Sequence, residues 1–225
     1  MGEHDGHRKR LRSRFLAHGL DALQDHEVLE LLLFYAQPRK DTNALARVLL
    51  KHFGSIAAVL EAPLAELKAI GGIGENAAIL LRLITPLSRR YLLSRTEKSV
   101  CLTSSQACGE YLLPYFFGAT EELVYLLCLD AKCKVLACRL LQAGSVNSAA
   151  VPLRKAAEIA MACNASAVIL AHNHTSGLAL PSRADIEVTE QLRAALDPLE
   201  IQLVDHIIVA DDEFVSMMDS SRLDP

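Results

Sequence analysis

The pattern of apolar and polar positions divides the chain into two stretches of different character. Residues 1–94 contain short segments whose apolar residues recur at helical spacing, separated by glycines and polar residues. Residues 101–225 instead alternate helical segments with short apolar runs of the kind that form buried strands. Since strands interleaved with helices indicate a layered α/β domain, we expect a small all-helical domain, a linker over residues 95–100 and a C-terminal α/β domain.

The second stretch begins with a predicted helix that Ser104 or Ser105 can cap. That helix would end near Leu113, because Pro114 follows it. The later elements predicted from the pattern are strands over residues 123–130, 135–141, 165–174 and 201–210 and helices over residues 152–163 and 183–195.

The helical segments of the first stretch lead into a glycine-rich turn. Leu64, Leu67 and Ile70 are followed by the glycines of residues 71–74, and a new helix begins at about Glu75. Backbone N–H groups at such a helix start can approach a phosphate. The same hairpin often serves only to pack, and Glu75 stands where a phosphate binder would favour a neutral or basic residue. The pattern favours packing slightly over contact with DNA.

The residues that carry most chemistry follow the apolar run at 165–170. Side chains two apart on a strand share a face, so His172 and His174 would point the same way. After a loop, Ser182 suits a helix N-cap and Asp185 falls in the first turn. Two imidazoles and a carboxylate can therefore converge, and such a ligand set suits zinc with an open catalytic position.

Each of these features also has a simpler explanation. Ser182 and Asp185 resemble a capping box, which needs no metal, and two histidines beside a turn can be solvated. All three groups on one strand–loop–helix frame favour the metal interpretation. Zinc hydrolysis further needs a base for the metal-bound water. Glu122, at the start of an apolar strand, is the candidate and Glu121 its competitor; charge alone does not choose between them, and a solvated strand edge explains either.

Composition narrows the class of protein. The chain has 225 residues, 51% of them hydrophobic, which allows one large domain or two modest ones. No apolar run reaches the roughly 20 residues of a membrane span, and the polar N-terminus lacks the apolar stretch of a signal peptide. The six cysteines contain no C-x-x-C pair, which indicates free thiols in a reducing compartment. We expect a cytoplasmic protein with no membrane partner; a second metal site at Cys128, Cys133 and Cys138 is poorly spaced.

The charge is distributed unevenly between the two stretches. Residues 1–98 hold 15 Lys and Arg against 11 Asp and Glu, and residues 99–225 hold 8 against 16. A basic run at residues 8–14 could touch phosphates, although such runs are usually solvated faces. A mildly basic half joined to an acidic half suggests two domains with different partners.

These residues together resemble a known signature. Glu122, then His172-x-His174, seven residues and Ser182-x-x-Asp185 are similar to the JAMM (MPN-plus) metalloprotease motif. The chain resembles the RadC family more closely, and over nearly its whole length, because that family also has an N-terminal helical part that ends in a helix-hairpin-helix. Further matching motifs lie at residues 144–148, 171–174, 176–177, 181–182 and 205–208.

The resemblance implies a fold, a cofactor and a reaction. The fold would be a JAMM/MPN-type layered α/β domain, with a cytidine-deaminase-like sheet and flanking helices. The residues that would hold one zinc per chain, with water in the fourth position, are His172, His174 and Asp185. Glu122, favoured over Glu121 by its register with the strand end, would be the general acid/base, and Ser182 would donate to the developing oxyanion. The substrate would be a protein or peptide, attacked at an amide or isopeptide carbonyl.

Two positions depart from the family pattern. Thr175 stands where the family usually has proline, which would leave the loop less rigid. Lys155 stands where it usually has a carboxylate, and substrate handling would change if that carboxylate supports the site. His206 lies inside an apolar strand, where a hydrogen-bonded core histidine is favoured over a role beside the metal. Asn173 could line the cleft without a catalytic role.

A second class of function stays open beside the hydrolase. The basic run at 8–14 and the turn and helix start at 70–78 could contact DNA, which would make the protein a DNA-binding accessory with a structural or vestigial metal site. The literal His-Asn-His string at 172–174 suggests a metal nuclease, but the nuclease motif of that name spreads its residues over a hairpin and a helix. The sequence indicates no oligomeric state.

Overall fold

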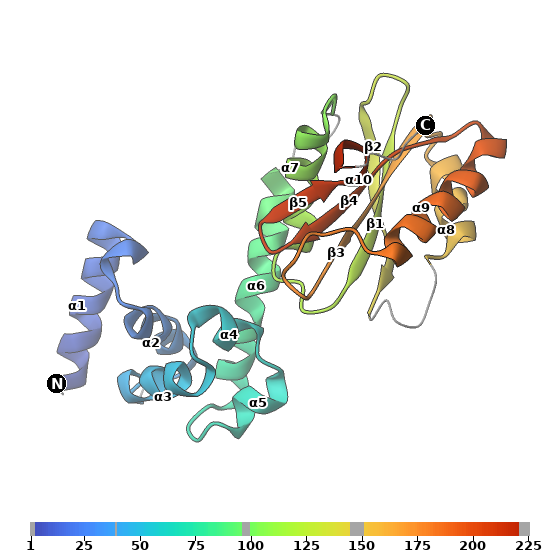
Figure 1. Cartoon of the computed structure of the whole chain (residues 1–225). Coiled ribbons are helices and arrows are strands. Elements are labelled where there is room, and N and C mark those ends of the chain that lie inside the picture. The colour runs from blue at the N-terminus through green and yellow to red at the C-terminus, as the bar shows by residue number, and fades with distance from the viewer. Residues whose placement is uncertain (1–2, 39, 96–99, 145–150, 221–225) are drawn as a thin grey trace. The chain divides into compact units, whose positions relative to one another are not determined.

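The chain divides into two compact units, Met1–Ser88 and Arg89–Pro225. The computed structural model describes residues 3–38, 40–95, 100–144 and 151–220 (Figure 1). Most of the predicted linker at 95–100 and of the motif at 144–148 lies outside these residues.

The N-terminal unit is built from helices, and the last of them, α6, ends in the second unit. Gly54 ends α3 at a φ of 90°, a conformation that favours glycine, and Ser55 caps α4 by accepting a hydrogen bond from the Ala58 N–H. Fully buried core residues include Leu29, Leu33, Leu49, Leu67 and Leu81. The elements are α1 (Glu3–His18), η1 (Leu20–Ala22), α2 (Asp25–Ala36), α3 (Asn43–Phe53), α4 (Ile56–Glu61), α5 (Leu64–Ala69) and α6 (Glu75–Arg95).

The second unit is a mixed α/β domain, which confirms the predicted fold class. Its helices are α7 (Ser105–Phe116), α8 (Leu153–Ala162), α9 (Arg183–Leu196), η3 (Asp197–Leu199) and α10 (Met217–Ser220). Its strands are β1 (Leu123–Leu129), β2 (Val135–Ala143), β3 (Ala167–Asn173), β4 (Gln202–Ala210) and β5 (Glu213–Ser216).

The strands form a five-stranded sheet in the order β2-β1-β3-β4-β5. β1 runs antiparallel to β2 and β3, β4 runs antiparallel to β5, and the pair of β3 and β4 is parallel. A parallel pair needs a crossover connection, and the chain supplies it through α9. The start of α9 is thereby brought to the end of β3.

Alternating side chains along the strands give the sheet two apolar faces. Val124, Leu126 and Leu170 pack with residues of α8 and α9, whereas Leu127 and Ile169 pack with residues of α7. The sheet therefore lies between α7 on one face and the pair α8 and α9 on the other (Figure 1).

The helix expected to stop before Pro114 continues through it to Phe116. Ser104 is its N-cap and accepts a hydrogen bond from the Ala107 N–H. Leu112 and Phe116 are buried on one face against the sheet. This packing outweighs the backbone hydrogen bond that proline removes, so the expected end at Leu113 was wrong.

Among the described residues, no helix combines the length and the apolar character that a membrane crossing requires.

The contact between α7 and β5 predicts that Gly109→Ala destabilises the second unit. A Cβ at Gly109 would lie 2.1–2.3 Å from three ring carbons of Phe214, so the helix or the ring must shift. We expect the free energy of unfolding to fall by about 1–3 kcal/mol, although alanine is ordinarily the better helix former. Denaturant unfolding of the full chain measures this change.

Glu110→Ala is the matched control, because Glu110 is exposed on the same helix and should change stability by less than about 0.5 kcal/mol. Combining Gly109→Ala with Phe214→Leu should recover part of the loss. Equal stability of Gly109→Ala and the wild-type chain would show that the two elements are not packed this closely.

Candidate metal centre

The end of β3 and the start of α9 bring three potential ligands together. His172 lies in β3, His174 follows its last residue, and Asp185 lies in the first turn of α9. One potential ligand atom from each lies within 4.8 Å of the other two. The capped helix start thus presents its carboxylate to the two imidazoles on the strand.

The distances within this cluster suit a tetrahedral metal. His172 Nε2 lies 2.9 Å from His174 Nε2 and 3.0 Å from Asp185 Oδ1, and His174 Nε2 lies 3.5 Å from Asp185 Oδ2. Ligand atoms about 2.1 Å from a tetrahedral zinc lie about 3.4 Å from one another. The three residues therefore fit such an ion with small adjustments, and they could hold one.

The electrostatic setting keeps the Asp185 carboxyl ionised. Burial alone would raise its pKa, but hydrogen bonds from His172 and Ser182 outweigh burial and hold the pKa well below its usual range. Asp185 is only 6% exposed. Because a metal ligand must be deprotonated, the carboxylate is already in the binding form at neutral pH.

Ser182 both caps α9 and contacts the candidate ligand. Its hydroxyl donates to Asp185 Oδ2 at 2.6 Å, and its backbone N–H donates to the same oxygen at 2.7 Å. Asp185 Oδ1 faces His172 instead. The capping box and the metal cluster are thus compatible, since Ser182 binds Oδ2 and leaves Oδ1 available to a metal. The predicted role of Ser182 as an oxyanion donor would require its hydroxyl to turn away from Asp185.

The ring of His174 contacts the loop that follows it, on the side away from the cluster. Its Nδ1 lies 3.1 Å from the carbonyl oxygen of Leu178. A carbonyl can only accept, so Nδ1 carries the proton and Nε2 keeps its lone pair on the side of the cluster. The contact between His174 and Leu178 therefore constrains this loop even though Thr175 stands in place of the proline.

The backbone around Glu122 is tied to the residue between the two histidines. The Asn173 side chain donates to the Glu121 carbonyl at 3.2 Å and accepts from the Leu123 N–H at 2.7 Å. Glu122 is half-buried and Glu121 is exposed. No local sequence signal pointed to this role of Asn173, because its partners are 50 and 52 residues away along the chain.

Lys155 binds backbone carbonyls of β2, the strand at the edge of the sheet. Its Nζ donates to the carbonyl oxygen of Leu141 at 2.5 Å and lies 3.3 Å from that of Leu140. The pairing of β1 with β2 slips at this point, so that Leu141 has no partner in the register. The lysine thus binds carbonyls of a β-bulge in the outer strand.

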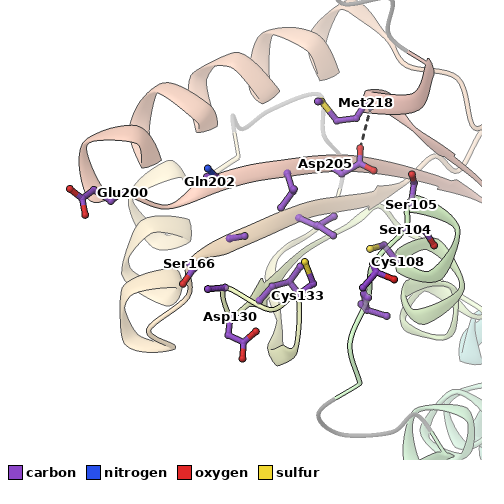
Figure 2. A pocket seen from close by; sticks show the side chains of 17 residues that line it. Ser104, Ser105, Cys108, Asp130, Cys133, Ser166, Glu200, Gln202, Asp205 and Met218 are labelled. Atoms are coloured by element: carbon purple, nitrogen blue, oxygen red, sulfur yellow. Dashed lines mark hydrogen bonds between the residues drawn. The ribbon is translucent and has the colours of Figure 1, made fainter.

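Cavities adjoin the sheet of the second unit. One of about 240 Å³ borders the cluster, and its lining includes Val124, Leu170, His172, Asp185, Val188 and His206. A larger one of about 570 Å³ is lined by residues of α7, the end of β1, the start of β3 and β4, and its lining includes Cys108, Ser166 and Asp205 (Figure 2). Burial raises the pKa of Cys108 in the larger cavity to about 11, so its thiol is neither a ready nucleophile nor a ready ligand.

The cysteines give no support to a second metal site. Burial raises the pKa of Cys128 to about 12 and also raises that of Cys138, so both thiols stay protonated. Within the described part of the chain, the group His172, His174 and Asp185 is the one cluster of three potential ligands.

Comparison with known proteins identifies the class of the second unit and then the family. Residues 102–222 match the family described as a RadC-like JAB domain, so the chain belongs to the RadC-like JAB family. JAB-domain proteins in general are metalloprotease-like and typically zinc-dependent. Residues 6–79 match the family described as UPF0758 N-terminal. The predicted resemblance to RadC proteins is thereby confirmed.

Two relatives extend this match over nearly the full chain. Each is named UPF0758 protein, one from Stutzerimonas stutzeri (strain A1501) and one from Ectopseudomonas mendocina (strain ymp). Each is 40% identical over 209 residues, which cover 93% of this chain and 93% of the relative.

The cluster predicts uptake of about one zinc per chain. Replacing Asp185 by Ala should abolish stoichiometric uptake, because it removes the only anionic ligand. Metal analysis of the purified full chain after dialysis against zinc measures this. His52→Ala is the control, since His52 is exposed on α3 and should leave zinc content unchanged. Undiminished zinc in Asp185→Ala would place the metal elsewhere.

Proposed function

We propose that this chain is a zinc-dependent hydrolase of the metallopeptidase or isopeptidase type, acting on a protein or peptide. The observation that carries the proposal is the convergence of His172, His174 and Asp185 on one point. Membership of the RadC-like JAB family supports it. The six cysteines are all free thiols, which fits the cytoplasmic location included in the proposal.

The proposed chemistry divides between the metal and the chain. A bound zinc supplies a water of lowered pKa and polarises the substrate carbonyl. Glu122 takes the proton of the attacking water and returns it to the leaving amine. Ser182 turns its hydroxyl from Asp185 Oδ2 to the developing oxyanion. The products are a carboxylate and a free amine.

The position of Glu122 follows from the edge of the sheet. Val124, two residues after Glu122, pairs with His172 across β1 and β3, and Asn173 binds the backbone before and after Glu122. The carbonyl of Glu122 also accepts from the Gly144 N–H at 2.9 Å. A base must be held near the metal-bound water to act efficiently, and these bonds fix its backbone beside the strand that carries the histidines.

An alternative is a DNA-binding accessory protein, and the open glycine turn before α6 favours it. A Cβ placed at Gly71 or Gly74 would have no neighbouring atom within 4 Å, so a phosphate could approach the backbone there. The basic run gives less support. Arg8 is buried and donates to the carbonyls of Gln37, Pro38 and Lys40, and Arg14 pairs with Glu27.

The proposed base predicts that Glu122→Gln keeps the zinc but loses hydrolysis. Loss of a general base typically costs 10²–10⁴-fold in rate, so turnover should fall by at least about 100-fold. A peptide and isopeptide hydrolysis screen, run with metal analysis on the same samples, measures both. Glu121→Gln is the matched control and should retain turnover. Activity retained by Glu122→Gln and lost by Glu121→Gln would reverse the assignment.

The DNA alternative predicts binding that weakens as salt rises and survives removal of zinc by a chelator. Lys9 and Arg10 are exposed, so Lys9→Glu with Arg10→Glu should lower both the affinity and its salt dependence if the basic run takes part. Fluorescence anisotropy with duplex DNA at several salt concentrations measures this. Binding that does not depend on salt would exclude phosphate contact as its basis.

A further inference from the structure

We propose that His206 and Thr189 are positioning residues of the metal centre, which hold His172 with its Nε2 lone pair directed to the metal. The proposal rests on the proposed function, because positioning a ligand matters only if a metal is bound. The protonation of the two imidazole rings can be tested whether or not the protein binds zinc. Neither residue belongs to the predicted ligand set. His206 lies in β4 and Thr189 in α9.

The three residues form a chain of short hydrogen bonds in the interior. His172 Nδ1 lies 2.8 Å from His206 Nε2, and His206 Nδ1 lies 2.6 Å from Thr189 Oγ1. Thr189 Oγ1 in turn lies 2.6 Å from the carbonyl oxygen of Asp185. His206 is 1% exposed and Thr189 is 6% exposed, so water does not compete freely for these contacts.

The positions of the protons follow from the last acceptor in this series of hydrogen bonds, the Asp185 carbonyl oxygen. The Asp185 carbonyl can only accept, so Thr189 gives its single hydroxyl proton to it. Thr189 Oγ1 must then accept from His206, which places the His206 proton on Nδ1. The ring of His206 is buried, and its two nitrogens face Thr189 Oγ1 and His172 Nδ1; burying a charged ring costs free energy, so the neutral ring is favoured and its Nε2 is the acceptor.

The same argument gives the position of the ring proton of His172, the candidate ligand. His206 Nε2 can only accept, so His172 donates from Nδ1. The remaining ring nitrogen, His172 Nε2, faces His174 and Asp185, and it is the nitrogen that a metal would bind. A metal needs this ring nitrogen as its ligand, and a hydrogen bond from the other ring nitrogen is the usual way in which proteins fix that arrangement.

This series of hydrogen bonds also connects two of the candidate ligands. It begins at His172, one candidate ligand, and returns through β4 and α9 to the backbone of Asp185, another candidate ligand. A change in the position of α9 would therefore disturb both the ring orientation and the carboxylate. The ring of His174 is held differently, because its Nδ1 faces the Leu178 carbonyl in the loop.

A core histidine with only a packing role would need partners too, so the two roles must be separated by experiment. Thr189→Val keeps the shape of the side chain and removes the hydroxyl. It frees His206 to take the other tautomer, which would place the proton of His172 on Nε2. Thr189→Ser keeps the hydroxyl and should restore the wild-type behaviour.

The first measurement is long-range ¹H–¹⁵N NMR of the histidine rings in the metal-free full chain. We expect both His172 and His206 to be protonated at Nδ1 in the wild type. A His172 ring without a proton on Nδ1 would overturn the proposal. This measurement needs no zinc binding and no variant, so it decides the inference even if a substitution prevents folding.

The second measurement is zinc affinity by competition with a chelator. Thr189→Val should bind zinc about 10–100-fold more weakly than the wild type, and Thr189→Ser should bind it nearly as tightly. Ser216→Ala is the matched control. It removes a buried hydroxyl that donates to Asp205 at 2.7 Å, beside His206 in sequence, and should lower stability without weakening zinc binding.

The outcomes separate this inference from the proposed function. Equal zinc affinity in Thr189→Val and the wild type would overturn the positioning role while leaving the hydrolase proposal intact. A wild-type chain that takes up no zinc would overturn the proposed function, and the ring protonation would still decide whether the hydrogen-bond chain is present.

Discussion

The parallel pairing of β3 with β4 is the constraint on which the candidate centre depends. A parallel pair cannot be joined by a hairpin, so the chain must leave the end of β3, cross the sheet through α9 and return as β4. That crossover sets Asp185 beside His172 and His174. It also sets His206, which pairs with Leu170 across the two strands, within hydrogen-bond reach of His172. The three candidate ligands and His206, which supports one of them, are therefore all positioned by the parallel pairing of β3 with β4.

The polar groups at this junction have partners within the described residues. Burying a polar group without a partner costs free energy, and here the partners lie on three different elements. Asp185 binds Ser182 and His172, and Thr189 binds both His206 and the Asp185 backbone. The result is a preorganised carboxylate and a fixed imidazole. Such preorganisation favours metal binding because little has to be reordered when the ion arrives.

Local patterns were enough to predict the strand, the loop and the helix start that carry His172, His174, Ser182 and Asp185. The long-range partners could not be predicted in the same way. The hydrogen bonds of Asn173 to the backbone on either side of Glu122 depend on the pairing of β1 with β3. The hydrogen bond of Lys155 to a β2 carbonyl depends on a bulge between β1 and β2. The sequence shows which residue types are present, whereas register decides what they touch.

The proposed chemistry depends above all on one zinc held by His172, His174 and Asp185. X-ray absorption at the zinc edge of the loaded full chain tests this directly. We expect a four-coordinate shell of imidazole nitrogens and oxygens at about 2.0–2.2 Å, with no sulfur. Sulfur scattering at about 2.3 Å would contradict this assignment, because the metal would then be bound by the cysteines.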